Sequence, residues 1–137
     1  MRAVLDVNVL IPALLSKDGA PGRLVAAWLD GVFEIVVSEA LLQELDRAFR
    51  YPKLRKLIAE EQAAAFIALL RAMAVAGVDA ANPDRISQDP GDDYLVALAR
   101  ASSSVLVTGD DDLLVLAPGL PIQSPVAFLA SLEGSVR

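Results

Sequence analysis

Short apolar runs alternate with helical patterns along this chain, and acidic residues stand where the two meet. Asp6 follows the apolar run 3–5, and Asp110 comes shortly after the run 105–107. Asp92 stands just before an apolar helical pattern. In a parallel α/β sheet, the carboxyl ends of the strands share one edge. The sequence therefore predicts that acids far apart along the chain meet at one edge of a sheet.

Such a gathering of carboxylates favours a divalent metal site. Like charges at close range raise each other's pKa, so a cluster is hard to keep ionised without a cation. The chain contains no histidine and no cysteine, which excludes Ser-His-Asp and Cys-His nucleophiles and zinc bound by Cys or His. The ligands that remain are carboxylate oxygens, which suit Mg²⁺, Mn²⁺ or Ca²⁺.

Length and composition predict one globular domain, residues 1–137. The chain is 55% hydrophobic, which argues against disorder. No apolar run approaches the roughly 20 residues of a membrane-spanning helix. The first charged residue after Arg2 is Asp6, too early for the core of a signal peptide. We therefore expect a cytoplasmic protein with no membrane contact.

The order of the patterns predicts strands alternating with helices, and hence a parallel sheet covered on both faces. The predicted strands are 2–5, 33–37, a short one near Val78, 105–107 and 122–123. The predicted helices begin near Val9, with Pro12 in the first turn, and near Pro21, ending at Gly31. The others are 38–50, capped by Ser38, then 54–58, 60–76, 92–101, a turn at 110–115, and one opened by Pro125.

Each acid also has an ordinary structural interpretation. Asp6 directly after a buried strand favours a ligand, because burial of an acid needs a partner, yet it can also cap the next helix. Asn8 can orient Asp6 or serve as a cap itself. Glu44 lies beside the apolar stripe of its helix, where a surface residue is also expected.

The acids at helix starts are equally ambiguous one by one. Asp92 and Asp93 stabilise a helix dipole by about 0.3 to 1 kcal/mol each, and the acids at 110–112 can do the same. Thr108 can donate its hydroxyl to a carboxylate or simply end a strand. The joint pattern of Asp6, Glu44, Asp92 and Asp110 is what favours a metal site.

The net charge of −6 is unusual for a protein that binds nucleic acid, but the basic residues are unevenly placed. Five of the 12 fall in one short segment: Arg47, Arg50, Lys53, Arg55 and Lys56. This segment can form a local positive patch for RNA phosphates. Alternatively, it is a solvated helix end with cations near its carboxyl terminus.

Four blocks in order resemble the PIN domain family, in particular the branch of bacterial toxin-antitoxin toxins. They are Leu5-Asp6-Val7-Asn8-Val9-Leu10, Ser38-Glu39-Ala40-Leu41-Leu42-Gln43-Glu44-Leu45, Asp89-Pro90-Gly91-Asp92-Asp93 and Val107-Thr108-Gly109-Asp110-Asp111-Asp112-Leu113. The resemblance implies a three-layer α/β/α fold and an endoribonuclease with one or two Mg²⁺ or Mn²⁺ ions in an acidic pocket. It also implies a homodimer and a protein antitoxin as partners.

The resemblance carries over residue by residue. It implies an acidic quartet, Asp6, Glu44, Asp92 and Asp110, as catalytic residues and metal ligands. The polar positions that match supporting residues are Asn8, Ser38, Thr108, Asp93 and Asp112.

Two other functions remain open on the sequence alone. One is a non-catalytic RNA-binding or regulatory domain with the same fold. The other is a receiver-type domain, in which a strand-end Asp accepts phosphate. A receiver needs an acid pair at the first strand end and a Lys after the last strand, whereas Asp6 has no acidic neighbour and no Lys follows Lys56. We therefore favour the nuclease.

Overall fold

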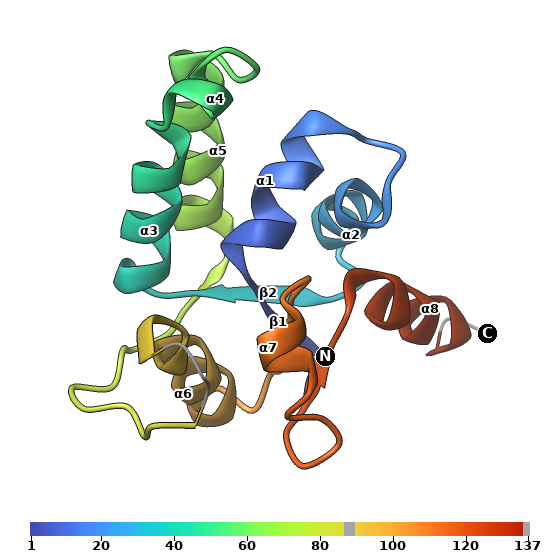
Figure 1. The fold of residues 1–137 in the computed structure, drawn as a ribbon. Coiled ribbons are helices and arrows are strands. Elements are labelled where there is room, and N and C mark those ends of the chain that lie inside the picture. The colour runs from blue at the N-terminus through green and yellow to red at the C-terminus, as the bar shows by residue number, and fades with distance from the viewer. Residues whose placement is uncertain (87–89, 136–137) are drawn as a thin grey trace.

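The sheet at the centre of the molecule is parallel throughout. The computed structural model describes residues 1–86 and 90–135, and in these residues five strands are arranged in the order β3-β2-β1-β4-β5 (Figure 1). The strands are β1 (Arg2–Leu5), β2 (Glu34–Val37), β3 (Val75–Ala76), β4 (Val105–Val107) and β5 (Ile122–Gln123). The predicted α/β class with a central parallel sheet is confirmed.

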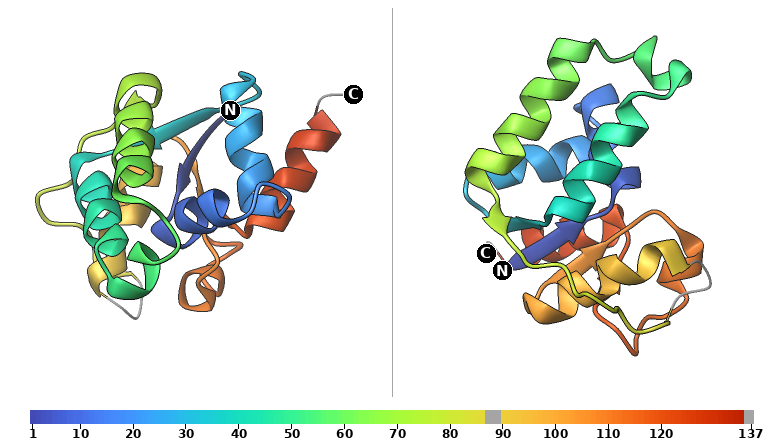
Figure 2. Two further views of the ribbon diagram at one scale, coloured as in Figure 1. Left: turned by 90° about the horizontal axis from the view of Figure 1, so that it is seen from above. Right: turned by 90° about the vertical axis from the view of Figure 1, so that its left-hand side faces the viewer.

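Helices cover both faces of this sheet and give the predicted three-layer α/β/α arrangement. They are α1 (Val7–Leu15), α2 (Ala20–Leu29), α3 (Glu39–Phe49), α4 (Pro52–Arg55), α5 (Glu60–Met73), the 3₁₀ turn η1 (Pro90–Asp92), α6 (Asp93–Ala101), α7 (Asp111–Leu114) and α8 (Pro125–Ser135). Helices α1, α2, α3 and α5 lie on one face and α6 on the other, as the two views of Figure 2 also show. Helix α6 packs on β1 and β4, and α8 packs on α2.

The register of the two central strands decides which residues meet at the carboxyl edge. Leu5 of β1 is level with Val107 of β4, and the two strands run in the same direction. The next residues, Asp6 and Thr108, must therefore leave the sheet side by side. The backbone N–H of Asp6 donates to the Val107 carbonyl at 2.9 Å, which continues the ladder to the point where α1 begins.

Burial of the strands and of one stripe on each helix holds this edge in place. Ala3, Val4 and Leu5 have no exposed surface, which agrees with a parallel strand covered on both faces. Helix α3 buries Leu41, Leu42, Leu45 and Phe49, at a spacing of three and four residues. The stripe anchors α3 beside α1, so that Glu44 on α3 is held near Asp6.

Two predicted elements differ from the structure. The strand expected near Val78 is β3, because the chain pairs with β2 directly after α5, with Val75 level with Val36. Val78 itself is exposed. Pro12 lies in the middle of α1 instead of its first turn, because α1 begins at Val7, directly after Asp6. Proline has no N–H, so the Asn8 carbonyl lacks its helical donor.

The remaining boundaries shift by smaller amounts. The short helix predicted at 54–58 is α4, and Pro52 occupies its first turn, where proline is well tolerated. Asp89, in the third sequence block, lies outside the described residues. Among the described helices, none has both the length and the apolar character needed to cross a membrane.

A close backbone contact at Gly22 leads to a stability prediction. A methyl group added at Gly22 would lie 2.3 Å from the Ser16 carbonyl oxygen and 2.8 Å from the Lys17 Cα atom. We expect Gly22→Ala to lower the free energy of unfolding by roughly 1–3 kcal/mol, because overpacking outweighs the gain in helix propensity of about 1 kcal/mol. Thermal or urea unfolding measures the difference.

Gly134→Ala is the matched control for this change. It makes the same substitution in a helix, where an added methyl group meets no described atom within 4 Å. We expect the free energy of unfolding to stay the same or to rise by up to about 1 kcal/mol, the gain in helix propensity. Equal stability of the two variants would contradict the close contact at Gly22.

Candidate functional site

The four acids predicted from the sequence line one cleft. Asp6, Glu44, Asp92 and Asp110 come from the end of β1, from α3, from η1 and from the loop after β4. The cleft has a volume of about 430 Å³, and the other residues that line it are Val7, Asn8, Ile11, Pro12, Ala48, Tyr51 and Leu54. One end is therefore acidic, and the other is mainly apolar and lies between α1, α3 and α4.

Asp6 is the most enclosed of these acids and is held by hydroxyl and amide donors. Only 6% of its surface is exposed. Its Oδ2 atom accepts a hydrogen bond from Thr108 Oγ1 at 2.9 Å and one from Asn8 Nδ2 at 3.3 Å. Both partners follow from the register of β1 and β4 and from the first turn of α1. The Asp6 carboxylate is thus fixed by neutral donors.

Thr108 and Asn8 also connect Asp6 to Asp110. Thr108 Oγ1 accepts from the backbone N–H of Asp110 at 3.0 Å, and Asn8 Oδ1 accepts from the Gly109 N–H at 3.0 Å. Asp110 caps α7, because its Oδ1 accepts from the Asp112 N–H at 2.9 Å. The loop after β4 is therefore tied to the start of α1.

Glu44 has a partner that the sequence analysis missed. The hydroxyl group of Tyr94, in the first turn of α6, donates a hydrogen bond to Glu44 Oε2. Tyr94 is half-buried and does not line the cleft, so it supports Glu44 from outside the cleft. The available signal was a tyrosine in an otherwise apolar helix face, because a buried tyrosine hydroxyl normally needs a polar partner.

The electrostatics show that these groups share one environment. Burial raises the pKa of the Asp6 carboxyl, and the charge of Glu44 adds to this rise, while the hydrogen bond from Thr108 acts in the opposite direction. Burial, the bond to Glu44 and the charges of Glu44, Asp6 and Asp92 raise the pKa of Tyr94. Tyr94 is therefore a neutral hydrogen-bond donor at physiological pH.

Four of the five predicted supporting residues do not line the cleft. One of them, Thr108, is fully buried and bonds to Asp6. Ser38 caps α3, with its Oγ atom accepting from the Leu41 N–H at 3.3 Å. Asp93 is buried on the other side of α6, where its Oδ1 accepts from the Ile86 N–H at 3.1 Å and its Oδ2 lies 3.6 Å from Arg85 Nε. Asp112 is exposed on α7.

The basic segment lies at the apolar end of the cleft, on the last turn of α3 and on α4. Arg50 pairs with Asp46 at 3.1 Å, and Arg55 lies 3.5 Å from Glu60. Within residues 1–86 and 90–135, Arg47, Lys53 and Lys56 form no such ion pair with an acid. Tyr51 and Leu54, which alternate with these cations, line the cleft.

The donor set suits a hard divalent cation in its chemistry. Four carboxylates and the side-chain amide of Asn8 supply oxygen atoms only, which is the set that Mg²⁺ and Mn²⁺ accept. A cation would also offset the burial of the Asp6 charge. In the described ranges 1–86 and 90–135, no three acids are grouped closely enough to hold one ion as they stand. Binding therefore requires the carboxylates to close around the ion.

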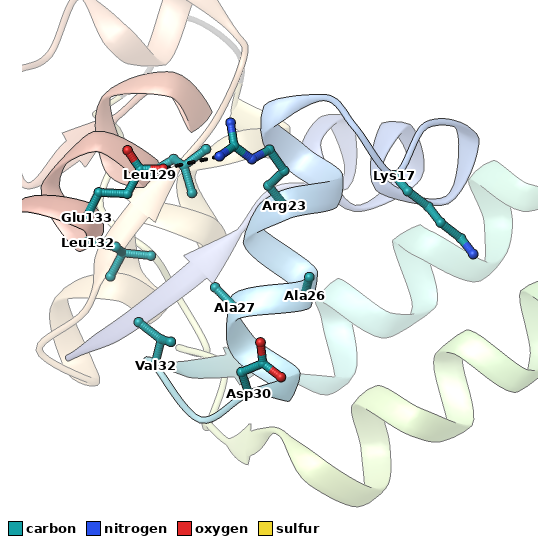
Figure 3. A pocket seen from close by; sticks show the side chains of 9 residues that line it. All are labelled: Lys17, Arg23, Ala26, Ala27, Asp30, Val32, Leu129, Leu132 and Glu133. Atoms are coloured by element: carbon teal, nitrogen blue, oxygen red, sulfur yellow. Dashed lines mark hydrogen bonds and ion pairs between the residues drawn. The ribbon is translucent and has the colours of Figure 1, made fainter. Parts of the chain in front are cut away.

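A second pocket, of about 470 Å³, lies away from the acids, between α2 and α8 (Figure 3). Its wall is mainly apolar and includes Val32, Leu129 and Leu132. Four charged residues also line it, among them the ion pair of Arg23 and Glu133. It contains no group from the predicted quartet. The two pockets are chemically different.

Comparison with known proteins places this chain in a family. The family model for the PIN domain matches residues 2–112, a range that contains all four acids of the cleft. The chain belongs to the PIN domain family. PIN domains are generally nucleases and typically use divalent metals.

The chain also resembles individual proteins in sequence and in fold. An uncharacterized protein of Methanocaldococcus jannaschii, MJ1680, is 31% identical over 123 residues, which cover 85% of this chain and 75% of the relative. PAE2754 of Pyrobaculum aerophilum has a similar fold, with a TM-score of 0.67, 18% identity and coverage of 98% of this chain and 90% of that one. VapBC2 of Rickettsia felis, solved with a promoter DNA fragment, also has a similar fold. Its TM-score is 0.63 at 16% identity, and the match covers 90% of this chain and 98% of that one.

The raised pKa of Asp6 predicts how the stability of this PIN domain changes with pH. The folded state holds the Asp6 proton more tightly than the unfolded chain does, so ionisation of Asp6 removes stability as the pH rises through its folded pKa. In Asp6→Asn this loss is absent. We expect the melting temperature of the variant, measured with EDTA, to rise relative to that of the wild type from about pH 4 upward.

Asp111→Asn is the control, because it neutralises an exposed acid outside the cleft. A plot of its melting temperature against pH should stay parallel to the plot for the wild type. A constant difference between Asp6→Asn and the wild type at all pH values would contradict the burial effect.

Proposed function

We propose that this PIN domain is a metal-dependent endoribonuclease that hydrolyses RNA phosphodiester bonds. The observation that supports this function most strongly is the cleft itself, where Asp6, Glu44, Asp92 and Asp110 gather at the carboxyl edge of the sheet. These four residues are the proposed ligands of one or two Mg²⁺ or Mn²⁺ ions. An ion held by these residues would activate water at neutral pH and would offset negative charge on the phosphate.

The chain's own residues then have distinct roles. Thr108 and Asn8 keep one oxygen of Asp6 occupied and fix the orientation of its carboxylate. The cap formed by Asp110 on α7 fixes the position of that acid relative to the loop. These contacts limit the movement required when the acids close on the ion. The chain has no histidine, and an ion held by these acids would supply the acid-base chemistry in its place.

The substrate path follows the shape of the cleft. RNA would lie from the acidic end toward α4, where Arg47, Lys53 and Lys56 contact its phosphates and offset the repulsion from the acids. Arg50 and Arg55 contribute less, because each already has an acidic partner.

We also propose a biological role as the toxin of a toxin-antitoxin pair in the cytoplasm. The support is the likeness of the fold to VapBC2 from Rickettsia felis, together with the sequence blocks described above. In this role, the chain acts as a single nuclease domain, forms a homodimer and binds a cognate protein antitoxin. Co-expression with the product of an adjacent gene tests this role separately from catalysis.

Neutral isosteres of the acids test the proposed catalysis. We expect Asp6→Asn and Asp110→Asn to lower the cleavage rate by roughly 100-fold to 1,000-fold, because charge at the metal site is lost while shape is kept. The substrate is a 5′-labelled pool of single-stranded RNA with Mn²⁺ present, and products are resolved on gels.

The adjacent Asp111→Asn is the matched control and should retain wild-type cleavage. If Asp110→Asn and Asp111→Asn cleave equally well, the metal mechanism is wrong. If the wild type binds the RNA pool with Mn²⁺ present but cuts nothing, the non-catalytic RNA-binding function replaces the nuclease.

The lysines test the path of the substrate. We expect Lys53→Gln to weaken RNA binding and to lower the salt slope of log K by about 0.7, the value for one phosphate contact on a single strand. Binding is measured in the Asp110→Asn background so that cleavage does not interfere. Lys17→Gln removes the same charge beside the second pocket and should leave both the RNA affinity and its salt slope unchanged. Equal effects of the two changes would exclude a specific path over α4.

A further inference from the structure

Tyr94 links the two helical layers at the candidate site. It lies in the first turn of α6, while its hydrogen-bond acceptor, Glu44, lies on α3 on the opposite face of the sheet. Tyr94 contributes no surface to the cleft, so its hydroxyl acts on the site only through Glu44. This arrangement suits a residue that positions an acid.

The bond divides the two oxygens of Glu44 into different roles. Oε2 accepts the Tyr94 hydroxyl proton, and Oε1 makes no hydrogen bond within the described part of the chain. A cation that takes both oxygens must compete with the tyrosine for Oε2. A cation that takes Oε1 alone leaves the bond intact. The bond therefore favours ligation of an ion through one oxygen.

Two neighbouring acids show the same pattern. Oδ2 of Asp6 accepts from Thr108 and Asn8, and Oδ1 of Asp110 accepts from a backbone N–H of α7. In Asp6, Glu44 and Asp110, a carboxylate oxygen thus accepts from a protein donor. The donor set is organised for ligands that each give one oxygen.

We propose that Tyr94 is a positioning residue that makes Glu44 a one-oxygen ligand and thereby favours Mg²⁺ and Mn²⁺ over Ca²⁺. Mg²⁺ demands a compact octahedral shell, whereas Ca²⁺ takes more oxygens and readily accepts both oxygens of one carboxylate. The inference rests on the proposed metal-dependent function. It adds a reason why this site selects the smaller ions.

Tyr94 is also the donor that can be removed most cleanly. The partner of Asp110 is a backbone group, and the Thr108 hydroxyl also holds the Asp110 N–H, so changing Thr108 disturbs two acids. Tyr94→Phe removes one hydroxyl group and keeps the ring. Tyr51→Phe is the matched control, because Tyr51 is the other tyrosine of the chain and lines the same cleft.

The test is calorimetric titration of the metal-free full chain with MnCl₂ and, separately, with CaCl₂. For Tyr94→Phe we expect Mn²⁺ affinity to fall about tenfold, the lower end of the range when the hydrogen-bond partner of a metal ligand is lost. Ca²⁺ affinity should not fall, so the preference for Mn²⁺ narrows by about tenfold. Tyr51→Phe should keep the wild-type ratio.

Glu44→Gln shows whether the effect passes through Glu44. In that background, adding Tyr94→Phe should leave both the Mn²⁺ affinity and the Ca²⁺ affinity unchanged, whereas a general loosening of α6 would still lower them. An unchanged ratio in Tyr94→Phe, with Mn²⁺ still bound by the wild type, overturns the positioning role alone. If the wild type binds neither ion, both this inference and the proposed metal-dependent function fail.

Discussion

The parallel register of β1 and β4 is the constraint on which the site depends. Because Leu5 is level with Val107, Asp6 and Thr108 leave the sheet as neighbours although 102 positions separate them. Their hydrogen bond then brings Asn8 and the loop of Asp110 to the same edge. If one of these strands slipped by one residue, its side chains would turn to the other face of the sheet and the acids would no longer meet.

Most of the protein donors that surround the acids are neutral. Thr108, Asn8 and Tyr94 satisfy carboxylate oxygens without adding positive charge, so the negative charge of the cleft is preserved for a cation. A lysine or arginine in any of these places would form a salt bridge and occupy the position of the ion. The five cations of the basic segment instead lie along α3, α4 and the residues next to them, at the apolar end of the cleft. This separation of the acids from the basic segment suits a site that must bind both a metal ion and a polyanion.

The fold and the acids at strand ends could be predicted because they follow from local patterns. Asp6 and Asp110 each come after an apolar strand, and parallel topology brings such positions together. The place of β3 could not be predicted, since pairing with Val36, and not the sequence around Val78, selects Val75. The Tyr94 bond joins two helices from different layers, so the tyrosine in an apolar helix face signals a polar partner but does not identify Glu44 as that partner. Ser38 shows the reverse difficulty, because a helix cap and a polar site residue look alike in sequence.

The two edges of the sheet have a consequence for the behaviour of the protein at high concentration. The edge strands β3 and β5 are each only two residues long, while the longer strands β1, β2 and β4 are enclosed between neighbours. A foreign strand therefore finds very few free backbone donors and acceptors to extend the ladder. The fold carries its own protection against strand-mediated aggregation, even though more than half of its residues are hydrophobic.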